Sequence, residues 1–240
     1  MRRNRYFARL RLVASWGMTW SILAAQAAGP VSNETPHHQH GSVSKESHAN
    51  RHMHRTDFQT LVERFENPDR LRWQKPHLVI QKLGDLSSKT IADIGAGTGY
   101  FAFPLAELAG KVLAIDIDQR FLDLINKKNE ALEKPLPIET RLVTEHDPLL
   151  MPGETDVVLV ANTYHHIMER TEYFRAVREK LATNGLLAIV DFKKEKLPVG
   201  PPVDMKLSPG SVVDELDDAG FSSISIDTQS LEYQYIILAR

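Results

Sequence analysis

The chain has 240 residues, of which 42% are hydrophobic and 25% charged, and a formal net charge of −2. This length is enough for one well-filled domain with an appendage and too short for two full α/β domains. The first 27 residues hold five arginines and no acidic residue, so the rest of the chain is more strongly acidic. An acidic body without a basic stripe argues against a nucleic-acid partner. The absence of cysteine excludes disulfides, thiolate metal ligands and thiol nucleophiles.

The N-terminus has the pattern of an export signal. Its arginine-rich start is followed by an uncharged stretch, and Ala25-Gln26-Ala27 is the small-x-small sequence that a signal peptidase cleaves. We therefore predict a signal peptide over 1–27 and a periplasmic or otherwise exported protein. The alternative is an uncleaved anchor with the domain outside, because the apolar stretch approaches the ~20 residues that span a bilayer. In both cases membrane contact is confined to residues 1–30.

Residues 28–55 are polar and rich in Ser, Asn and His, without an apolar period, and this composition predicts a disordered linker. Six of the ten histidines lie there. Neutral imidazoles in such a tract can chelate Zn²⁺, Cu²⁺ or Ni²⁺, so one interpretation is a weak metal site. The other is a solvated tether without ligand geometry. The ligands of the weak site would be His37, His38, His40, His52 and His54, and no metal is expected in the folded domain.

Residues 56–240 predict one α/β domain. Two helical segments come first, one starting at Asp57 and one over 69–83 that is interrupted at Pro76. Strands and helices then alternate, which indicates a parallel sheet covered by helices on both faces. The predicted strands are 90–94, 111–116, 138–144, 155–162, 186–192, 221–226 and 233–239, and the predicted helices between them are 100–109, 118–130, 169–182 and 208–219.

The C-terminal end of the chain breaks this alternation. Only a short polar link separates the last two predicted strands, and a parallel crossover needs about a dozen residues or more. We therefore predict that strand 233–239 is antiparallel and lies between strands 186–192 and 221–226. The predicted fold is a doubly wound, Rossmann-like sheet of seven strands, mostly parallel with an antiparallel last strand. This arrangement differs from that of the dinucleotide-binding fold.

A glycine-rich loop, DIGAGTGY from Asp93 to Tyr100, follows the first predicted strand. Glycines let the backbone approach a ligand closely, and the helix behind them offers free N–H groups to an anion. Asp116 ends the next strand, where a carboxylate can bind both hydroxyls of a ribose. A dinucleotide site, an adenosyl-ligand site and a tight turn alone are the three interpretations. Asp93 favours the second, because an acid there would repel a pyrophosphate and attract the ammonium of a methionine moiety.

This loop resembles motif I of the class I S-adenosylmethionine-dependent methyltransferases, and residues 112–116 resemble motif II. The similarity continues through 146–148 and 156–167 to 181–187, where it departs slightly from the usual Leu-x-Pro-Gly-Gly. It implies methyltransferase activity with S-adenosylmethionine as cofactor. The residues implied for the cofactor are Gly95, Gly97 and Gly99 at the methionine part, Asp116 at the ribose, Ile117 against adenine, His146 or Asp147 at the adenine edge, and Asn162 at the floor of the reaction site. Asp93, near the ammonium of the methionine part, completes the predicted cofactor-binding residues.

A polar segment follows the fourth predicted strand, and ligands in such sheets bind beyond the carboxyl ends of the strands. Methyl transfer requires an acceptor aligned with the sulfonium and, where needed, a base that takes its proton. The candidate catalytic residues are Tyr164, His165 and His166, a histidine as base and Tyr164 as a wall of the pocket. The alternative is that they pack the loop or bind substrate without proton transfer.

The function predicted from the sequence is enzymatic methyl transfer to an unidentified small molecule. The resemblance includes quinone C-methyltransferases and arsenite methyltransferases, of which the second group binds arsenic through cysteines that this chain lacks. A non-catalytic adenosyl-ligand-binding or metal-sensing envelope protein is the second hypothesis, because an exported methyltransferase needs a supply of a cytosolic cofactor. An NAD-dependent oxidoreductase is the third, since Gly97, Gly99 and Ala102 formally satisfy the dinucleotide pattern.

Overall fold

The computed structural model describes residues 48–240. The predicted signal peptide and residues 28–47 of the predicted linker lie outside the described residues. Over residues 48–240, none of the helices has the length and apolar character that a membrane crossing requires.

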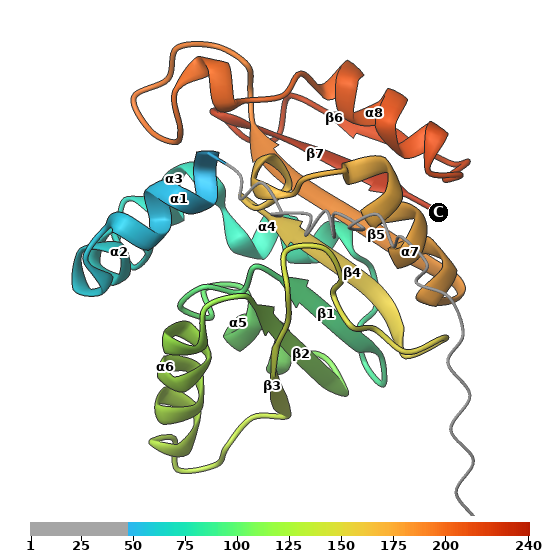
Figure 1. Ribbon diagram of the computed structural model, residues 1–240. Coiled ribbons are helices and arrows are strands. Elements are labelled where there is room, and N and C mark those ends of the chain that lie inside the picture. The colour runs from blue at the N-terminus through green and yellow to red at the C-terminus, as the bar shows by residue number, and fades with distance from the viewer. Residues whose placement is uncertain (1–47) are drawn as a thin grey trace, which may run out of the picture. The chain divides into compact units, whose positions relative to one another are not determined.

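A seven-stranded sheet with the strand order β3-β2-β1-β4-β5-β7-β6 lies between two layers of helices (Figure 1). Strands β1 to β5 pair in parallel, whereas β7 pairs antiparallel with both β5 and β6. The prediction of a mostly parallel sheet with an antiparallel last strand is therefore confirmed, including the place of that strand. The strands are β1 (Thr90–Ile94), β2 (Lys111–Asp116), β3 (Ile138–Leu142), β4 (Thr155–Ala161), β5 (Leu181–Phe192), β6 (Ser225–Asp227) and β7 (Gln234–Ala239).

Both faces of the sheet are buried, which explains why its central strands are nearly continuous apolar runs. Successive side chains of a strand point to opposite faces. In β4, Val158 and Val160 therefore pack with helices α7 and α8, whereas Val157 and Leu159 pack with α4, α5 and α6. These helices are α4 (Pro76–Lys82), α5 (Ala102–Ala106), α6 (Gln119–Glu130), α7 (Arg170–Lys180) and α8 (Pro209–Asp218).

Several helices begin where capping residues predict. The side chains of Asp57, Asp118 and Ser208 each accept a backbone N–H of the first turn, at the starts of α2 (Phe58–Phe65), α6 and α8. Helix α3 (Arg70–Gln74) ends at Lys75, whose φ is 45°, and α4 restarts at Pro76 as predicted. The helix predicted over 100–109 is reduced to α5, because the turns of the glycine loop continue up to residue 101.

Residues 48–55 differ from the prediction, because they form helix α1 (His48–Arg55) instead of the end of a disordered linker. The helix contacts the 3₁₀ turn η1 (Tyr164–His166). Asn50 is only 6% exposed. Its Nδ2 donates to Oε1 of Glu145 at 2.8 Å, and its Oδ1 lies 2.9 Å from Nδ1 of His166. These long-range contacts override the local composition on which the linker prediction depended.

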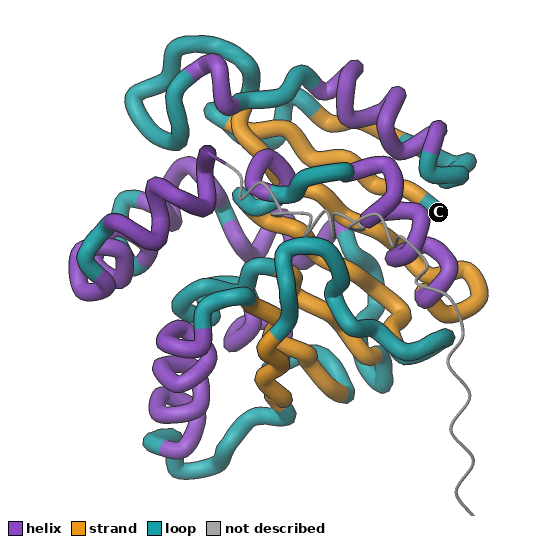
Figure 2. The backbone as a smooth tube through the Cα atoms, viewed as in Figure 1, coloured by secondary structure: helices purple, strands orange, loops and turns teal. Residues whose placement is uncertain are grey.

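The carboxyl ends of the parallel strands meet at one edge of the sheet. Helices α1, α2 and α3 lie at this edge, where the arrowheads of β1, β2 and β4 point in Figure 1. The long loop over 193–202 and the loop over 143–154 also leave from strand ends there (Figure 2). The chain continues from β1 to β2 on one side and reaches β4 on the other, so the switch point lies between β1 and β4. In open α/β sheets this is the position of the ligand crevice.

Candidate functional site

A cavity of about 890 Å³ lies at the carboxyl ends of the strands around this switch point. Its volume is within the range of roughly 300–1,000 Å³ that ligand pockets occupy. The glycine loop, the residues after β2, β3 and β4, the N-terminal helices and the loop after β5 all contribute to its wall. Of the predicted site residues, Gly95, Gly97, Asp116, Ile117, Asn162, His165 and His166 line the cavity, and Asp93, Gly99, His146, Asp147 and Tyr164 do not.

The glycines of the loop serve different contacts. A Cβ on Gly95 would lie 2.2 Å from Oγ1 of Thr163, so the bare glycine lets the loops after β1 and β4 meet. A Cβ on Gly97 would have no neighbour closer than 3.4 Å, because this glycine faces the cavity. A Cβ on Gly99 would lie 2.8 Å from the Phe103 ring. The structure therefore gives Gly99 a packing role behind the cavity and not a place in its wall.

Asp116 ends β2 directly beside Gly97. Its Oδ2 accepts the N–H of Gly97 at 2.8 Å, and its Oδ1 accepts the N–H of Asp118 at 3.0 Å. Burial raises the pKa of this carboxyl to about 6, although these hydrogen bonds oppose the shift. The backbone thus fixes a carboxylate at the cavity wall, in the position where Rossmann-like folds bind ribose hydroxyls.

Asp93, in β1 just before the glycine loop, is 2% exposed. Its Oδ2 has no hydrogen-bond partner within residues 48–240. Burial, together with the nearby charge of Asp116, raises the pKa of Asp93 to about 7. Asp93 does not line the cavity, so an effect on a ligand there would come from its charge and not from contact. A buried carboxyl with an open acceptor favours a cationic group nearby.

Arg70 of helix α3 is a cavity residue that the sequence interpretation missed. Its Nε donates to Oε1 of Gln74 at 2.5 Å, and its Nη1 donates to the carbonyl oxygen of Phe65 at 2.9 Å. The guanidinium lies 3.8 Å from the centroid of the Tyr100 ring. Burial lowers the pKa of Arg70 to about 10, so the group is still charged at neutral pH. A guanidinium held in one orientation is suited to binding a carboxylate.

The residues that line the cavity after β3 are not the ones that the sequence predicts for the adenine edge. Thr144 and Glu145 line the cavity, whereas His146 and Asp147 are exposed outside it. Thr144 forms an isolated bridge with Asp147, and Oδ1 of Asp147 accepts the N–H of Leu149 at 2.7 Å. This turn directs His146 and Asp147 away from the cavity. Spacing in the sequence does not reveal which side of a turn faces a pocket.

Asn162 forms part of the cavity floor in a left-handed conformation, with φ 59°. Its Oδ1 accepts from Nε2 of Gln234, and its Nδ2 lies 3.5 Å from Oε1 of Gln74. Both glutamines are fully buried. A buried amide network therefore holds Asn162 in place, and no local signal in the sequence links its three members.

His165 forms a second polar centre with Asp191, at the end of β5. Its Nδ1 lies 3.0 Å from each carboxylate oxygen, and the two side chains are only 4% and 3% exposed. Burial alone would raise the pKa of Asp191, but the charge and hydrogen bonds of His165 lower it. The sequence interpretation missed Asp191, although an acid near the end of an apolar strand, like Asp116, was an available signal.

The β5 side of the cavity is aromatic. The ring of Trp73 lies 5.7 Å from that of Phe192 and 6.4 Å from that of Tyr233. The proline-rich loop closes over Phe192, since a Cβ on Gly200 would lie 2.6 Å from its ring. Trp73 of helix α3 thus belongs to the wall of the cavity.

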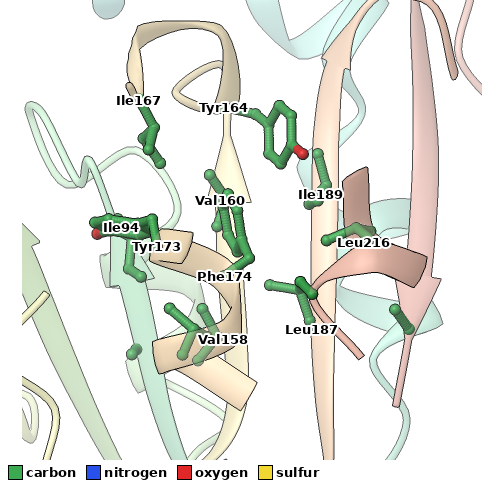
Figure 3. Close-up of a cluster of buried hydrophobic side chains, with 14 of the residues drawn as sticks. Ile94, Val158, Val160, Tyr164, Ile167, Tyr173, Phe174, Leu187, Ile189 and Leu216 are labelled. Atoms are coloured by element: carbon green, nitrogen blue, oxygen red, sulfur yellow. The ribbon is translucent and has the colours of Figure 1, made fainter. Parts of the chain in front are cut away.

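Tyr164 points into the core, where Figure 3 places its ring among Val160, Ile189 and other apolar side chains. The ring stacks on Phe174 at 4.8 Å, and the hydroxyl donates to Oε2 of Glu215 at 2.7 Å. Burial and the Glu215 carboxylate raise the pKa of Tyr164. The expected catalytic role of Tyr164 therefore gives way to a packing role. In a short 3₁₀ turn, consecutive side chains face different directions.

The described residues contain no group of three or more His, Asp or Glu placed to hold a metal ion. The predicted weak histidine site is a separate matter. His37, His38 and His40 lie outside the described residues, and the structure does not describe the side chains of His52 and His54 in α1. That prediction therefore stays a prediction.

Comparison with known proteins agrees with this geometry. Residues 92–187 match a protein family described as a methyltransferase domain. The crystal structure of a SAM dependent methyltransferase from Aquifex aeolicus is similar, with a TM-score of 0.70 and 25% identity over 77% of this chain and 98% of that chain. Ribosomal protein L11 methyltransferase of Deinococcus radiodurans is 30% identical over 64% of this chain and 53% of its own length. Ubiquinone biosynthesis O-methyltransferase of Caulobacter sp. (strain K31) is 27% identical over 53% of each.

The chain spans about half the length of the curated relatives it matches. The strand order, the glycine loop with Asp116 and these similarities place it among the class I S-adenosylmethionine-dependent methyltransferases. The cofactor of this family is S-adenosylmethionine, and the residues present fit it. Gly97 leaves space at the cavity, and Asp93, in the strand that leads into the glycine loop, has a buried Oδ2 without a partner within residues 48–240.

Replacement of Tyr164 by phenylalanine tests its packing role. We expect Tyr164→Phe to lower the free energy of unfolding by about 1.5–3 kcal/mol, because one hydrogen bond to a carboxylate is lost. Arg170 keeps both of its bonds to Glu215, so that carboxylate stays paired. Calorimetric affinity for S-adenosylhomocysteine should not change. A large loss of affinity in a folded variant would contradict the packing role and show that Tyr164 contributes to the binding site.

Proposed function

We propose that the chain transfers the methyl group of S-adenosylmethionine to a small organic acceptor. The observation that supports this proposal most strongly is one continuous cavity, which joins Asp116 and the glycine loop to His165 and the aromatic wall at Trp73. When bound, the cofactor supplies an electrophilic methyl group on a sulfonium. A cavity of this size favours a small acceptor over a macromolecular one. Relatives named as ubiquinone biosynthesis O-methyltransferases are consistent with such an acceptor.

Different residues of the cavity would bind different parts of the cofactor. Asp116 would accept hydrogen bonds from the ribose hydroxyls, and Ile117 would pack against adenine. Arg70 would pair with the carboxylate of the methionine part, while Asp93 favours its ammonium through charge. Glu145, which Asn50 of α1 holds in place, would face the adenine edge.

Transfer of a labelled methyl group tests the proposed activity. The full chain is incubated with methyl-labelled S-adenosylmethionine and a cell-envelope extract, and Asp116→Ala serves as the comparison. We expect label in the small-molecule fraction with the wild-type chain and little with the variant. No transfer by a wild-type chain that binds S-adenosylhomocysteine would contradict the proposal. That result would favour the non-catalytic adenosyl-binding alternative.

Arg70 should distinguish ligands with and without a carboxylate. We expect Arg70→Ala to weaken S-adenosylhomocysteine about 10- to 150-fold, since a hydrogen bond to a charged group contributes about 1.5–3 kcal/mol. Binding of 5′-methylthioadenosine, which lacks the amino-acid part, should not change. Arg178→Ala is the control, because Arg178 is exposed and outside the cavity. Equal losses for both ligands, measured by calorimetry, would show that Arg70 acts only on the fold.

The affinity for S-adenosylhomocysteine should rise as the pH increases from about 5.5 to 7.5. In the free protein the pKa of Asp93 is raised to about 7 and that of Asp116 to about 6, so both are partly protonated at the lower pH. The ligand's ammonium and ribose hydroxyls favour the ionised carboxylates, so binding releases protons and weakens as the pH falls through these values. Calorimetry in two buffers of different ionisation enthalpy measures this release. Proton uptake on binding would contradict it.

We also propose that residues 1–27 direct export of the domain, on the basis of their sequence pattern. Fractionation of cells that produce the full chain, with mass spectrometry of its N-terminus, tests this proposal. We expect a periplasmic protein cleaved after about Ala27. An intact chain in the membrane would support the anchor instead, and an intact chain in the cytosol would contradict both.

A further inference from the structure

The hydrogen bonds of Asp191 determine where the proton lies on His165. The carboxylate accepts from Nδ1 of His165 at 3.0 Å, from the backbone N–H of His165 at 3.2 Å and from the N–H of Phe192 at 2.7 Å. An ionised carboxylate only accepts hydrogen bonds, so the ring proton shared with it is on Nδ1. In the neutral imidazole the lone pair is then on Nε2.

Nε2 of His165 is available for a ligand. His165 lines the cavity, and its Nε2 makes no hydrogen bond to any residue from 48 to 240. His165 lies two residues after Thr163, which meets the glycine loop at Gly95. The imidazole is thus bonded to the end of β5, in the chain segment that meets the glycine loop through Thr163.

The cavity that His165 lines also has an apolar wall that is suited to a flat body. Phe192 follows Asp191 at the end of β5 and points to the opposite face of the strand, but it lines the same cavity as His165, and its ring lies 5.7 Å from that of Trp73. Gly200 brings the proline-rich loop onto the same ring. Aromatic walls with one polar group at their end orient a ring that carries one polar substituent.

We propose that the acceptor is a phenol-class compound, with its ring against Trp73 and Phe192 and its hydroxyl donating to Nε2 of His165. This inference rests on the proposed methyltransferase function. In the step, a bond forms between the hydroxyl oxygen and the methyl carbon while the carbon–sulfur bond breaks and its electron pair stays on sulfur. The hydroxyl proton passes to Nε2 of His165. Asp191 is the positioning residue, because it fixes the imidazole tautomer and stabilises the resulting imidazolium.

Other acceptor classes fit this pair less well. A carboxylate needs no base, and it would be repelled by the buried charge of Asp191. An aliphatic hydroxyl is too weak an acid for an imidazole to assist strongly. A phenolic hydroxyl has a pKa of about 10, like that of tyrosine, which is close enough for general-base transfer to an imidazole. The pair therefore matches an aromatic hydroxyl.

The tautomer of His165 is the first test, and it is independent of activity. In ¹⁵N NMR spectra of the full chain loaded with S-adenosylhomocysteine, we expect His165, assigned through His165→Gln, to carry its proton on Nδ1. Asp191→Asn should change this tautomer, whereas Asp214→Asn, at an exposed position on α8, should not. A wild-type His165 with its proton on Nε2 would overturn the inference.

A matched pair of probes tests the acceptor class. We expect phenol to shift the Nε2 signal of His165 in the loaded protein and anisole, which has no hydroxyl, to leave it unchanged. A shift with both probes, or with neither, would overturn the assignment of a hydroxyl acceptor.

Transfer to phenol tests the role of His165 as base. With methyl-labelled S-adenosylmethionine and phenol, His165→Gln should form labelled anisole about 10²- to 10⁴-fold more slowly than the wild type. Its affinity for S-adenosylhomocysteine should be unchanged. His77→Gln, an exposed position on α4, should match the wild type. Equal rates for His165→Gln and wild type, or no anisole from the wild type, would count against the inference. Failure to bind S-adenosylhomocysteine at all would instead contradict the proposed function.

Discussion

Gly95→Ala is expected to lower the free energy of unfolding by about 2–6 kcal/mol. The φ of Gly95 is 75°, a conformation that costs an L-residue about 1–3 kcal/mol. The added Cβ would also lie 2.2 Å from Oγ1 of Thr163, and relief of such an overlap costs about 1–3 kcal/mol more. Denaturant unfolding of the full chain measures the sum.

Gly84→Ala is the matched control for this substitution. Gly84 has a φ of 85°, and an added Cβ would have no atom within 4 Å. Gly84→Ala should therefore cost only the free energy of the backbone strain. The difference between the two variants then reports the contact with Thr163. Adding Thr163→Gly to Gly95→Ala should restore part of the loss. Equal destabilisation of both single variants would mean that the loops after β1 and β4 do not meet as described.

Asp116→Asn is expected to weaken S-adenosylhomocysteine about 10- to 150-fold, equivalent to the loss of about 1.5–3 kcal/mol from hydrogen bonds to a charged group. An asparagine presents one acceptor oxygen, whereas the carboxylate already accepts from Gly97 and Asp118 and has lone pairs left for ribose. Asp123→Asn, at an exposed position on α6, is the control. Unchanged affinity in a folded Asp116→Asn variant would show that Asp116 does not bind the ligand.

The fold could be predicted where a local pattern has a single structural solution. Strands β1 and β2 have the predicted bounds, because each is an apolar run enclosed by polar residues and turns. The direction of β7 followed from the shortness of the link before it. Asp116 was predicted at the site for a similar reason, since the end of a parallel strand next to a glycine loop always faces the same edge of the sheet.

The residues whose roles the sequence did not predict are placed by contacts between segments that are distant in the chain. Asn50 is buried because it bonds to Glu145 and His166, which are 95 and 116 positions further along the chain. Arg70 has no feature in the sequence that separates it from the other arginines of its region. Tyr164 and His165 are adjacent, and only the path of the 3₁₀ turn decides which enters the core. Local composition and periodicity contain none of this information.

Isothermal titration of the full chain with S-adenosylhomocysteine, and separately with NAD, tests the central claim most directly. Both ligands contain an adenosine that could reach Asp116, but only the first has the ammonium and carboxylate that Asp93 and Arg70 are placed to favour. We predict saturable binding of S-adenosylhomocysteine and none of NAD. Tighter binding of NAD than of S-adenosylhomocysteine would contradict the assignment of this cavity to an adenosyl sulfonium cofactor.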